Sequence, residues 1–137
     1  MKLTVLSFAL VLPFAAQAGE LKLTLLGQGF TGKGLFVAVH SNAHDFPTRD
    51  DKAIKSAVIA TGDKTELTIP NIAPGEYAIA VFADVNGNGK LDSNFIGWPI
   101  EPHGVSRDAK GRFGPPKFAD AAFRVSEGVT RQTITIK

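Results

Sequence analysis

The strongest chemical signal in this chain is the nine-residue stretch Asp84-Val-Asn-Gly-Asn-Gly-Lys-Leu-Asp92. It places side-chain oxygens at alternate positions on Asp84, Asn86 and Asn88, followed by a glycine and then by the carboxylate of Asp92. In an EF-hand calcium loop, positions 1, 3, 5 and 9 offer side-chain oxygens, position 6 is glycine and position 7 offers a main-chain carbonyl, here that of Lys90. The spacing therefore predicts a calcium site.

The same stretch lacks the last ligand of such a loop, because Phe95 stands where the glutamate of position 12 is expected. The loop offers about five oxygens, whereas calcium takes six to eight, so water or a carboxylate such as Glu101 or Asp120 would have to complete the shell. We expect weak binding, on the order of 10⁻⁴ to 10⁻³ M, as in extracellular modules. Asn-Gly repeats also form tight turns without any ion, so a metal-free loop capped by Asp84 is the competing hypothesis.

Other catalytic and metal-binding patterns find little support. The chain has no cysteine and no Gly-x-Ser-x-Gly, His-Glu-x-x-His, P-loop or dinucleotide-binding pattern. His40 and His44 are four residues apart, but one ends a predicted strand and the other precedes a proline, so zinc binding is the minor interpretation. Ser106, His103 and Asp108 could form a hidden catalytic triad, although a polar loop explains their clustering more simply.

Residues 83–119 contain few strand signals but many Gly, Pro and aromatic residues. A long irregular segment in a small domain is usually functional or disordered, and its aromatic content favours an ordered insert. Trp98 could be an exposed platform for a sugar or peptide, or could instead pin the insert to the core. With Arg107, Arg112 and Phe113 it forms the predicted ligand or partner surface, for which a solvated basic face is the alternative.

The N-terminus resembles an export signal, with Lys2, an apolar stretch and Ala16-Gln-Ala18 as the cleavage pattern. Cleavage after Ala18 predicts a periplasmic or secreted domain over residues 19–137. Without cysteine there is no disulfide framework and no lipid-anchoring residue, and we expect no membrane anchor. The formal net charge of +2 gives no reason to expect nucleic-acid binding.

Short segments with period-two alternation predict an all-β fold, as in Leu21, Leu23 and Leu25 with polar residues between them. About seven strands with frequent turn residues favour a single antiparallel β-sandwich of immunoglobulin or transthyretin type. The one helical turn that we expect lies within Thr48–Ser56. The other strand candidates are Leu35–His40, Val58–Ala60, Thr65–Ile69, Tyr77–Phe82, Ala122–Val125 and Gln132–Ile136.

Pro74-Gly-Glu-Tyr77 predicts a chain reversal in which the Tyr77 hydroxyl returns to the backbone at a corner of the sandwich. From this corner the order Pro74–Asp92, Gly97-Trp-Pro99, Gly104-Val-Ser106 and Phe113–Ala121 resembles the bacterial domain-of-unknown-function 2141 family. The resemblance covers nearly all of residues 19–137 and implies a small exported β-sandwich, without implying an activity. Val85 and Val105 depart from the acidic and aromatic residues that are common in that family.

Three function classes follow from these patterns. The preferred hypothesis is an exported, non-catalytic module that binds a protein, peptide or glycan through the 83–119 insert and is stabilised by calcium in the 84–92 loop. A metal-dependent hydrolase is the first alternative, although calcium is a poor Lewis acid beside zinc. A structural or adhesion subunit that self-associates through an exposed strand edge is the second.

Overall fold

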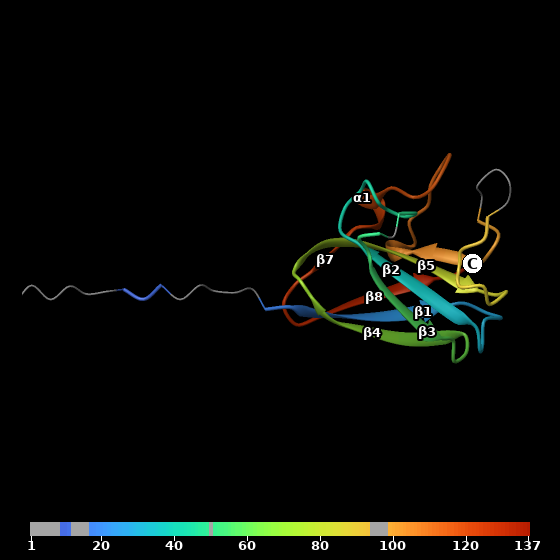
Figure 1. The fold of residues 1–137 in the computed structure, drawn as a ribbon, viewed down its shortest axis with the longest axis horizontal. Helices are drawn as coiled ribbons and strands as arrows, with labels where there is room; N and C mark the ends of the chain where they lie inside the picture. The colour runs from blue at the N-terminus through green and yellow to red at the C-terminus, as the bar shows by residue number, and fades with distance from the viewer. Residues whose placement is uncertain (1–8, 12–16, 50, 94–98) are drawn as a thin grey trace, which may run out of the picture.

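A computed structural model describes residues 9–11, 17–49, 51–93 and 99–137. Its elements are almost all strands, with one 3₁₀ turn and one four-residue helix (Figure 1). None of the described helices has the length and hydropathy that a membrane span requires. In chain order the elements are β1 (Gly19–Leu26), β2 (Gly34–His40), β3 (Ile54–Ile59), β4 (Lys64–Ile72), β5 (Gly75–Asp84), β6 (His103–Val105), η1 (Ser106–Asp108), α1 (Phe118–Ala121), β7 (Phe123–Val125) and β8 (Val129–Thr135).

The strands form two sheets, and the predicted β-sandwich is confirmed. One sheet has the order β4-β1-β8, and the other has the order β3-β2-β5-β6, with β7 paired to one end of β5. All pairs are antiparallel except β1 and β8, which run parallel over Glu20–Leu26 and Val129–Thr135. The sandwich therefore has one parallel pair, formed by its first and last strands.

The core between the sheets follows from the alternation of side chains along each strand. Leu21, Leu23 and Leu25 of β1 are almost completely buried, whereas Lys22 and Thr24 between them lie on the partly exposed outer face. The facing sheet contributes alternate residues of β2 and β5 in the same way. The main cluster also includes Leu35, Val37, Val39, Ile79, Val81, Val125 and Ile134.

The corner before β5 forms as predicted. The Tyr77 hydroxyl donates a hydrogen bond to the carbonyl of Ala73 at 2.7 Å. The Tyr77 ring belongs to the main core, so this bond satisfies a polar group that would otherwise be buried at the edge of apolar surface.

A second, smaller core covers the outer face of the five-stranded sheet. Its buried members Phe46, Ala78, Val105 and Ala121 come from the segment after β2, from β5, from β6 and from α1. Figure 1 shows α1 beside the chain that follows β2, both on the same side of the sheet. The ring centroids of Phe46 and Phe118 are 6.0 Å apart in an edge-to-face arrangement. Part of the 83–119 insert, through Val105, Ala109 and Phe118, therefore packs over β5 together with the segment after β2.

The described residues of Thr48–Ser56 form no helix, and Ile54–Ser56 begins β3. A turn of helical spacing lies earlier, where the Arg49 N–H donates to the Asp45 carbonyl at 2.8 Å. Asn42 caps this turn: its side-chain oxygen accepts the Asp45 N–H at 2.9 Å. Asn at such a position competes for the main chain locally and starts a turn without an apolar repeat, which is why the sequence pattern missed it.

Candidate metal loop and partner surface

The 84–92 loop is built around the carboxylate of Asp84, the last residue of β5. Its Oδ1 accepts the N–H groups of Gly87 and Asn88 at 3.1 and 3.2 Å, and its Oδ2 accepts that of Gly89 at 2.7 Å. The Asp84 side chain is consequently buried. Gly87 and Gly89 have φ values of 76° and 75°, which residues with a Cβ rarely adopt, and this explains the two glycines. The Asp84 carboxylate therefore organises the main chain of the loop through three hydrogen bonds.

The exposed side of the loop brings the other predicted ligands together. The side-chain amide nitrogens of Asn86 and Asn88 both donate to the carboxylate of Asp92. The Asn88 nitrogen lies 2.8 Å from Oδ1 of Asp92 and 3.0 Å from its Oδ2. The Asn88 side-chain oxygen accepts the N–H of Lys90 at 2.9 Å. The structure thus places four of the predicted ligand side chains in one network, with the Lys90 main chain next to it.

Glu101 closes the loop from outside the nine-residue pattern. Its Oε1 accepts the N–H of Val85, and its Oε2 accepts the N–H of Asp92, each at 3.1 Å. The Glu101 side chain is only 7% exposed. Of the two carboxylates that the sequence offered for completing the shell, Glu101 therefore lies at the loop, whereas Asp120 lies on α1.

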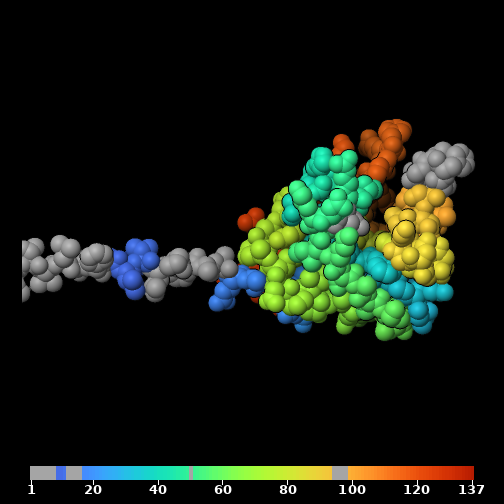
Figure 2. Space-filling model, viewed as in Figure 1, coloured from blue at the N-terminus to red at the C-terminus, as the bar shows by residue number. Residues whose placement is uncertain are grey.

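The electrostatic balance of this loop is negative. Among the described residues, ion pairs involve Glu20, Asp45 and Glu66, and none involves Asp84, Asp92 or Glu101. No group of three or more His, Asp or Glu side chains in the described part of the chain is arranged to hold a metal ion. A cation site here must therefore use asparagine and main-chain oxygens in addition to the carboxylates. Figure 2 shows the loop, in yellow, at the end of the sandwich away from the start of β1.

Ser106, His103 and Asp108, the residues of the possible triad, each contact main-chain groups through their side chains. The Ser106 hydroxyl, which is fully buried, donates to the Ala121 carbonyl at 2.6 Å and accepts the Ile79 N–H at 2.9 Å. The Asp108 carboxylate accepts the N–H of Thr135 at 2.9 Å. His103 places its Nδ1 3.0 Å from the Glu101 carbonyl. Ser106 therefore joins β5 to the end of α1, and its hydroxyl has both a donor and an acceptor role.

The two neighbouring histidines lie in different environments. His40 is buried, and its ring meets that of Phe46 edge to face at 5.5 Å. His44 is exposed and lies 3.0 Å from the Asp45 carboxylate. The Asn42 hydrogen bond, followed by that of His44, lowers the pKa of Asp45 below its ordinary value of 3.8.

The predicted partner surface is described only in part, because Trp98 lies outside the described residues. Phe113 is fully exposed and Arg112 is exposed beside it. The Arg107 guanidinium donates to the Ala122 carbonyl at 3.3 Å, so its head is drawn toward the chain after α1. Arg112 and Phe113 are therefore the predicted surface residues that present an open face.

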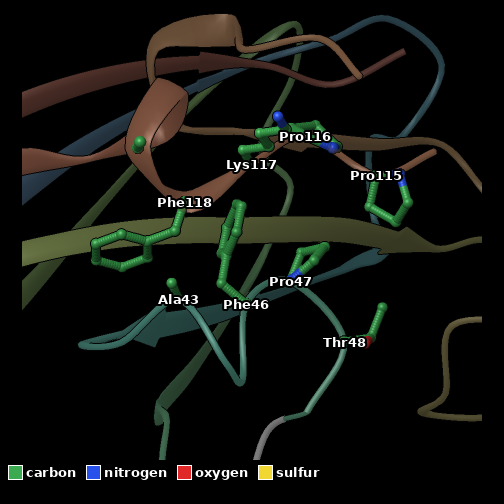
Figure 3. A pocket seen from close by; sticks show the side chains of 9 residues that line it. Ala43, Phe46, Pro47, Thr48, Pro115, Pro116, Lys117 and Phe118 are labelled. Atoms are coloured by element: carbon green, nitrogen blue, oxygen red, sulfur yellow. The ribbon is translucent and has the colours of Figure 1, made fainter. Parts of the chain in front are cut away.

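The structure has a groove of about 520 Å³ that the sequence did not indicate. Part of its lining follows Arg112 and Phe113 closely in the sequence. One wall is the segment after β2, with Phe46 and the cis peptide-linked Pro47, and the other is residues 115–119. Figure 3 shows the Phe46 ring between Phe118 and Pro47. Its lining is mostly apolar, with Lys117 as the charged member. The prolines at 47, 115 and 116 were the sequence signal that could have suggested two rigid walls.

Comparison with protein families gives one match. Residues 31–133 match the model of a family described as an uncharacterized protein conserved in bacteria (DUF2141). Comparison with curated proteins and with solved structures gave no match. The matched region contains the 84–92 loop, Glu101 and both walls of the groove.

Proposed function

The chain belongs to the bacterial DUF2141 family, and we propose that it is an exported, non-catalytic β-sandwich module. In this proposal the 84–92 loop binds calcium, and the insert supplies a face for a partner. The observation that carries it is the convergence of Asp84, Asn86, Asn88 and Asp92 with Glu101 at the end of β5.

Charge supports a cation at this position. Asp84 and Glu101 are both buried, and their partners in the described structure are main-chain N–H groups. A buried carboxylate without a cationic neighbour is costly, and a divalent ion beside it would offset that cost. Each carboxylate oxygen has two lone pairs, so an oxygen that accepts an N–H can still contact an ion.

Calcium binding would require a change in the loop. In the structure the amide nitrogens of Asn86 and Asn88 face Asp92, and nitrogen with two hydrogens cannot ligate calcium. Both amides would have to turn over to offer their oxygens. Asn88 would then exchange its hydrogen bonds with Asp92 and Lys90 for metal contacts, so part of the binding free energy is used to break them. This supports weak affinity.

The roles of Ser106 and Asp108 support a non-catalytic module. A serine nucleophile needs its hydroxyl at a reactive surface and hydrogen-bonded to a base. The Ser106 hydroxyl is fully buried and bonded to the main chain on both sides.

The partner face that we propose is the groove lined by residues 43–48 and 115–119, together with Arg112 and Phe113. Its apolar walls and prolines suit an extended peptide, and Lys117 on its lining favours acidic side chains in that peptide. Aromatic-lined grooves bind proline-rich segments at low entropic cost, because those segments are already extended before they bind.

Thermal unfolding in calcium and in chelator tests the metal proposal. Calcium should raise the midpoint for the wild type and not for Asp92→Ala, because binding to the folded state alone stabilises it. At about 100 times Kd the stabilisation is about 2.7 kcal/mol. Asp120→Ala, which removes one carboxylate on α1 away from the loop, is the matched control and should keep the full shift. Equal midpoints in calcium and chelator for the wild type would contradict the metal proposal.

Selection of displayed peptides on the purified protein tests the partner face separately. We expect enriched sequences to be acidic and to lose binding to Lys117→Glu, while Lys110→Glu, an exposed lysine outside the groove lining, keeps it. Enrichment that is indifferent to Lys117→Glu would contradict the groove as the site. Export is tested by the N-terminal residue of the protein recovered from the periplasm or medium, which should be Gly19.

A further inference from the structure

The main-chain groups on one side of β3 point away from the sheet. The hydrogen bonds of β5 show which residues of β3 these are. On β5 the Ile79 N–H donates to the Ser106 hydroxyl and the Ala83 N–H donates to the Pro102 carbonyl, so both point toward the β6 side. In an antiparallel ladder, successive residues direct their main-chain groups to opposite neighbours. Carrying this alternation across the register of β5, β2 and β3 turns Ile54, Ser56 and Val58 toward β2. Ala60 agrees, since its N–H and C=O bond to Lys33 and Gly32 beside β2.

Lys55, Ala57 and Ile59 are therefore the residues whose N–H and C=O groups face outward. Among the described strands β3 pairs only with β2. All three residues are exposed, and the Ile59 side chain is 60% exposed. An unpaired row of this kind is a template for another strand.

The C-terminal end of the outer edge of β8 is closed by other parts of the fold. The Thr135 N–H donates to Asp108, and the main chain of Lys137 exchanges hydrogen bonds of 3.0 and 3.1 Å with His103 of β6. Gly104 allows this approach, since a Cβ there would lie 2.3 Å from the Thr135 carbonyl oxygen. A strand could not pair along this end without displacing Asp108 and β6, and a two-fold pair on the exposed residues before it would place Arg131 opposite Arg131.

The outer edge of β4 is present but poorly suited to pairing. The Gly27 N–H donates to Asp63, so alternate residues of β4 face β1 and Lys64, Glu66, Thr68 and Pro70 face outward. Pro70 has no N–H, and a register shift lies beside it. Lys64 and Glu66 form an exposed ion pair on the same edge. Charges, proline and irregular register are the devices that keep edge strands apart.

We propose that two copies of this chain pair through β3 in an antiparallel, two-fold arrangement centred on Ala57. Ala57 of one copy then lies opposite Ala57 of the other, and Lys55 lies opposite Ile59 at both ends. Lys55 and Ile59 lie two residues before and after Ala57, so each of the three residues meets an outward-facing residue of the second copy. Each opposed pair exchanges two main-chain hydrogen bonds.

The side chains fit this pairing. Ala57 is small, so nothing bulky lies on the two-fold axis. The exposed Ile59 is covered by the methylene stem of Lys55 from the other copy, whose ammonium group stays in water. The two Lys55 residues lie at opposite ends of the pair and do not repel at short range. A contact of one short strand is smaller than a standard stable interface, so we expect a weak, reversible dimer.

Sedimentation of the purified protein over a concentration series tests the dimer. Ala57→Lys places two like charges opposite each other on the axis and should weaken association about fivefold or more. Thr68→Lys adds the same charge to the outward edge of β4 and is the matched control, which should sediment as the wild type. A monomer at every concentration, or a dimer that Ala57→Lys leaves unchanged, would overturn the proposal in favour of a foreign strand or none.

Register is tested with single cysteines, which the cysteine-free sequence makes unambiguous. Across the two-fold pair the Ala57 Cα atoms should be about 5.5 Å apart, whereas the two Lys55 residues are separated by four strand positions, or about 13 Å. A thiol cross-linker of about 8 Å should therefore join Ala57→Cys copies and not Lys55→Cys copies. A mixture of Lys55→Cys and Ile59→Cys should be joined again. Cross-linking of Lys55→Cys alone as fast as Ala57→Cys would overturn this register.

Discussion

Glu101 holds the main-chain N–H of Asp92 at 3.1 Å, so a buried carboxylate from beyond the loop fixes the loop's far end. The other oxygen of Glu101 holds Val85 at the near end. One side chain thus fastens both ends of the candidate metal loop to the chain that leads into β6.

Replacing Glu101 by Gln should destabilise the protein even in chelator. The amide matches the carboxylate in shape but puts an NH₂ donor against one of two N–H donors, leaving that main-chain group unsatisfied. We expect a loss of about 1–3 kcal/mol in the free energy of unfolding, measured in urea. Glu66→Gln on the exposed edge of β4 is the control and should change stability by no more than about 0.5 kcal/mol. Equal stabilities of the two variants would contradict the role given to Glu101.

Asp84→Ala and Asp92→Ala should separate structural from metal-binding roles. Asp84 accepts three main-chain N–H groups, so its removal should cost about 2–3 kcal/mol with chelator present. Asp92 is half-buried, and among the described residues its carboxylate accepts only side-chain amides, so its removal should matter mainly in calcium. Urea unfolding of both variants with and without calcium provides the measurement. A calcium-only effect for Asp84→Ala would show that the loop is not organised by its carboxylate.

Ser106→Ala should lower the free energy of unfolding by about 2–4 kcal/mol, because it leaves the Ile79 N–H and the Ala121 carbonyl buried without their partner. Chemical denaturation measures this. Ser41→Ala, which removes an exposed hydroxyl, is the control. A variant as stable as the wild type would mean that the link between β5 and α1 is weak.

The lowered pKa of Asp45 predicts that the stability of the protein depends on pH through the turn that forms one wall of the groove. Its pKa is lowered in the folded protein by Asn42 and then by His44, so the folded state holds fewer protons than the unfolded state. The stabilisation is therefore present above pH 3.8, the ordinary value, and is lost as the pH falls through the lower folded value. Asp45→Asn should be less stable than the wild type near neutral pH, and the two curves of stability against pH should converge at low pH. A difference that does not change with pH would contradict this.

Much of the sandwich was predictable because its strands alternate strongly. Leu21, Leu23 and Leu25 identify β1 without reference to any neighbour, and each of the seven predicted segments overlaps a strand. β6 escaped because it has three residues, one of them Gly104, and is held by partners far away in sequence. The parallel pairing of β1 with β8 leaves no local pattern either, because period-two alternation is the same for parallel and antiparallel neighbours.

The candidate site was predictable where its residues are consecutive. The loop from Asp84 to Asp92 forms a network as its spacing suggested, whereas the position of Glu101 depends on the path of the insert. The groove depends on two segments, 43–48 and 115–119, that meet only through the second core. Sequence spacing carries no information on such a meeting.

The parallel β1–β8 pair also determines how the domain would carry tension. β1 is entered at one end of the pair and β8 is left at the other, over seven consecutive register positions. A pull between these two ends would slide the strands along each other, so the hydrogen bonds across the whole pair would share the load in shear. Unzipping, in which bonds break one at a time, would not be available along this direction. The fold therefore places a contact that is loaded in shear between the start of β1 and the end of β8.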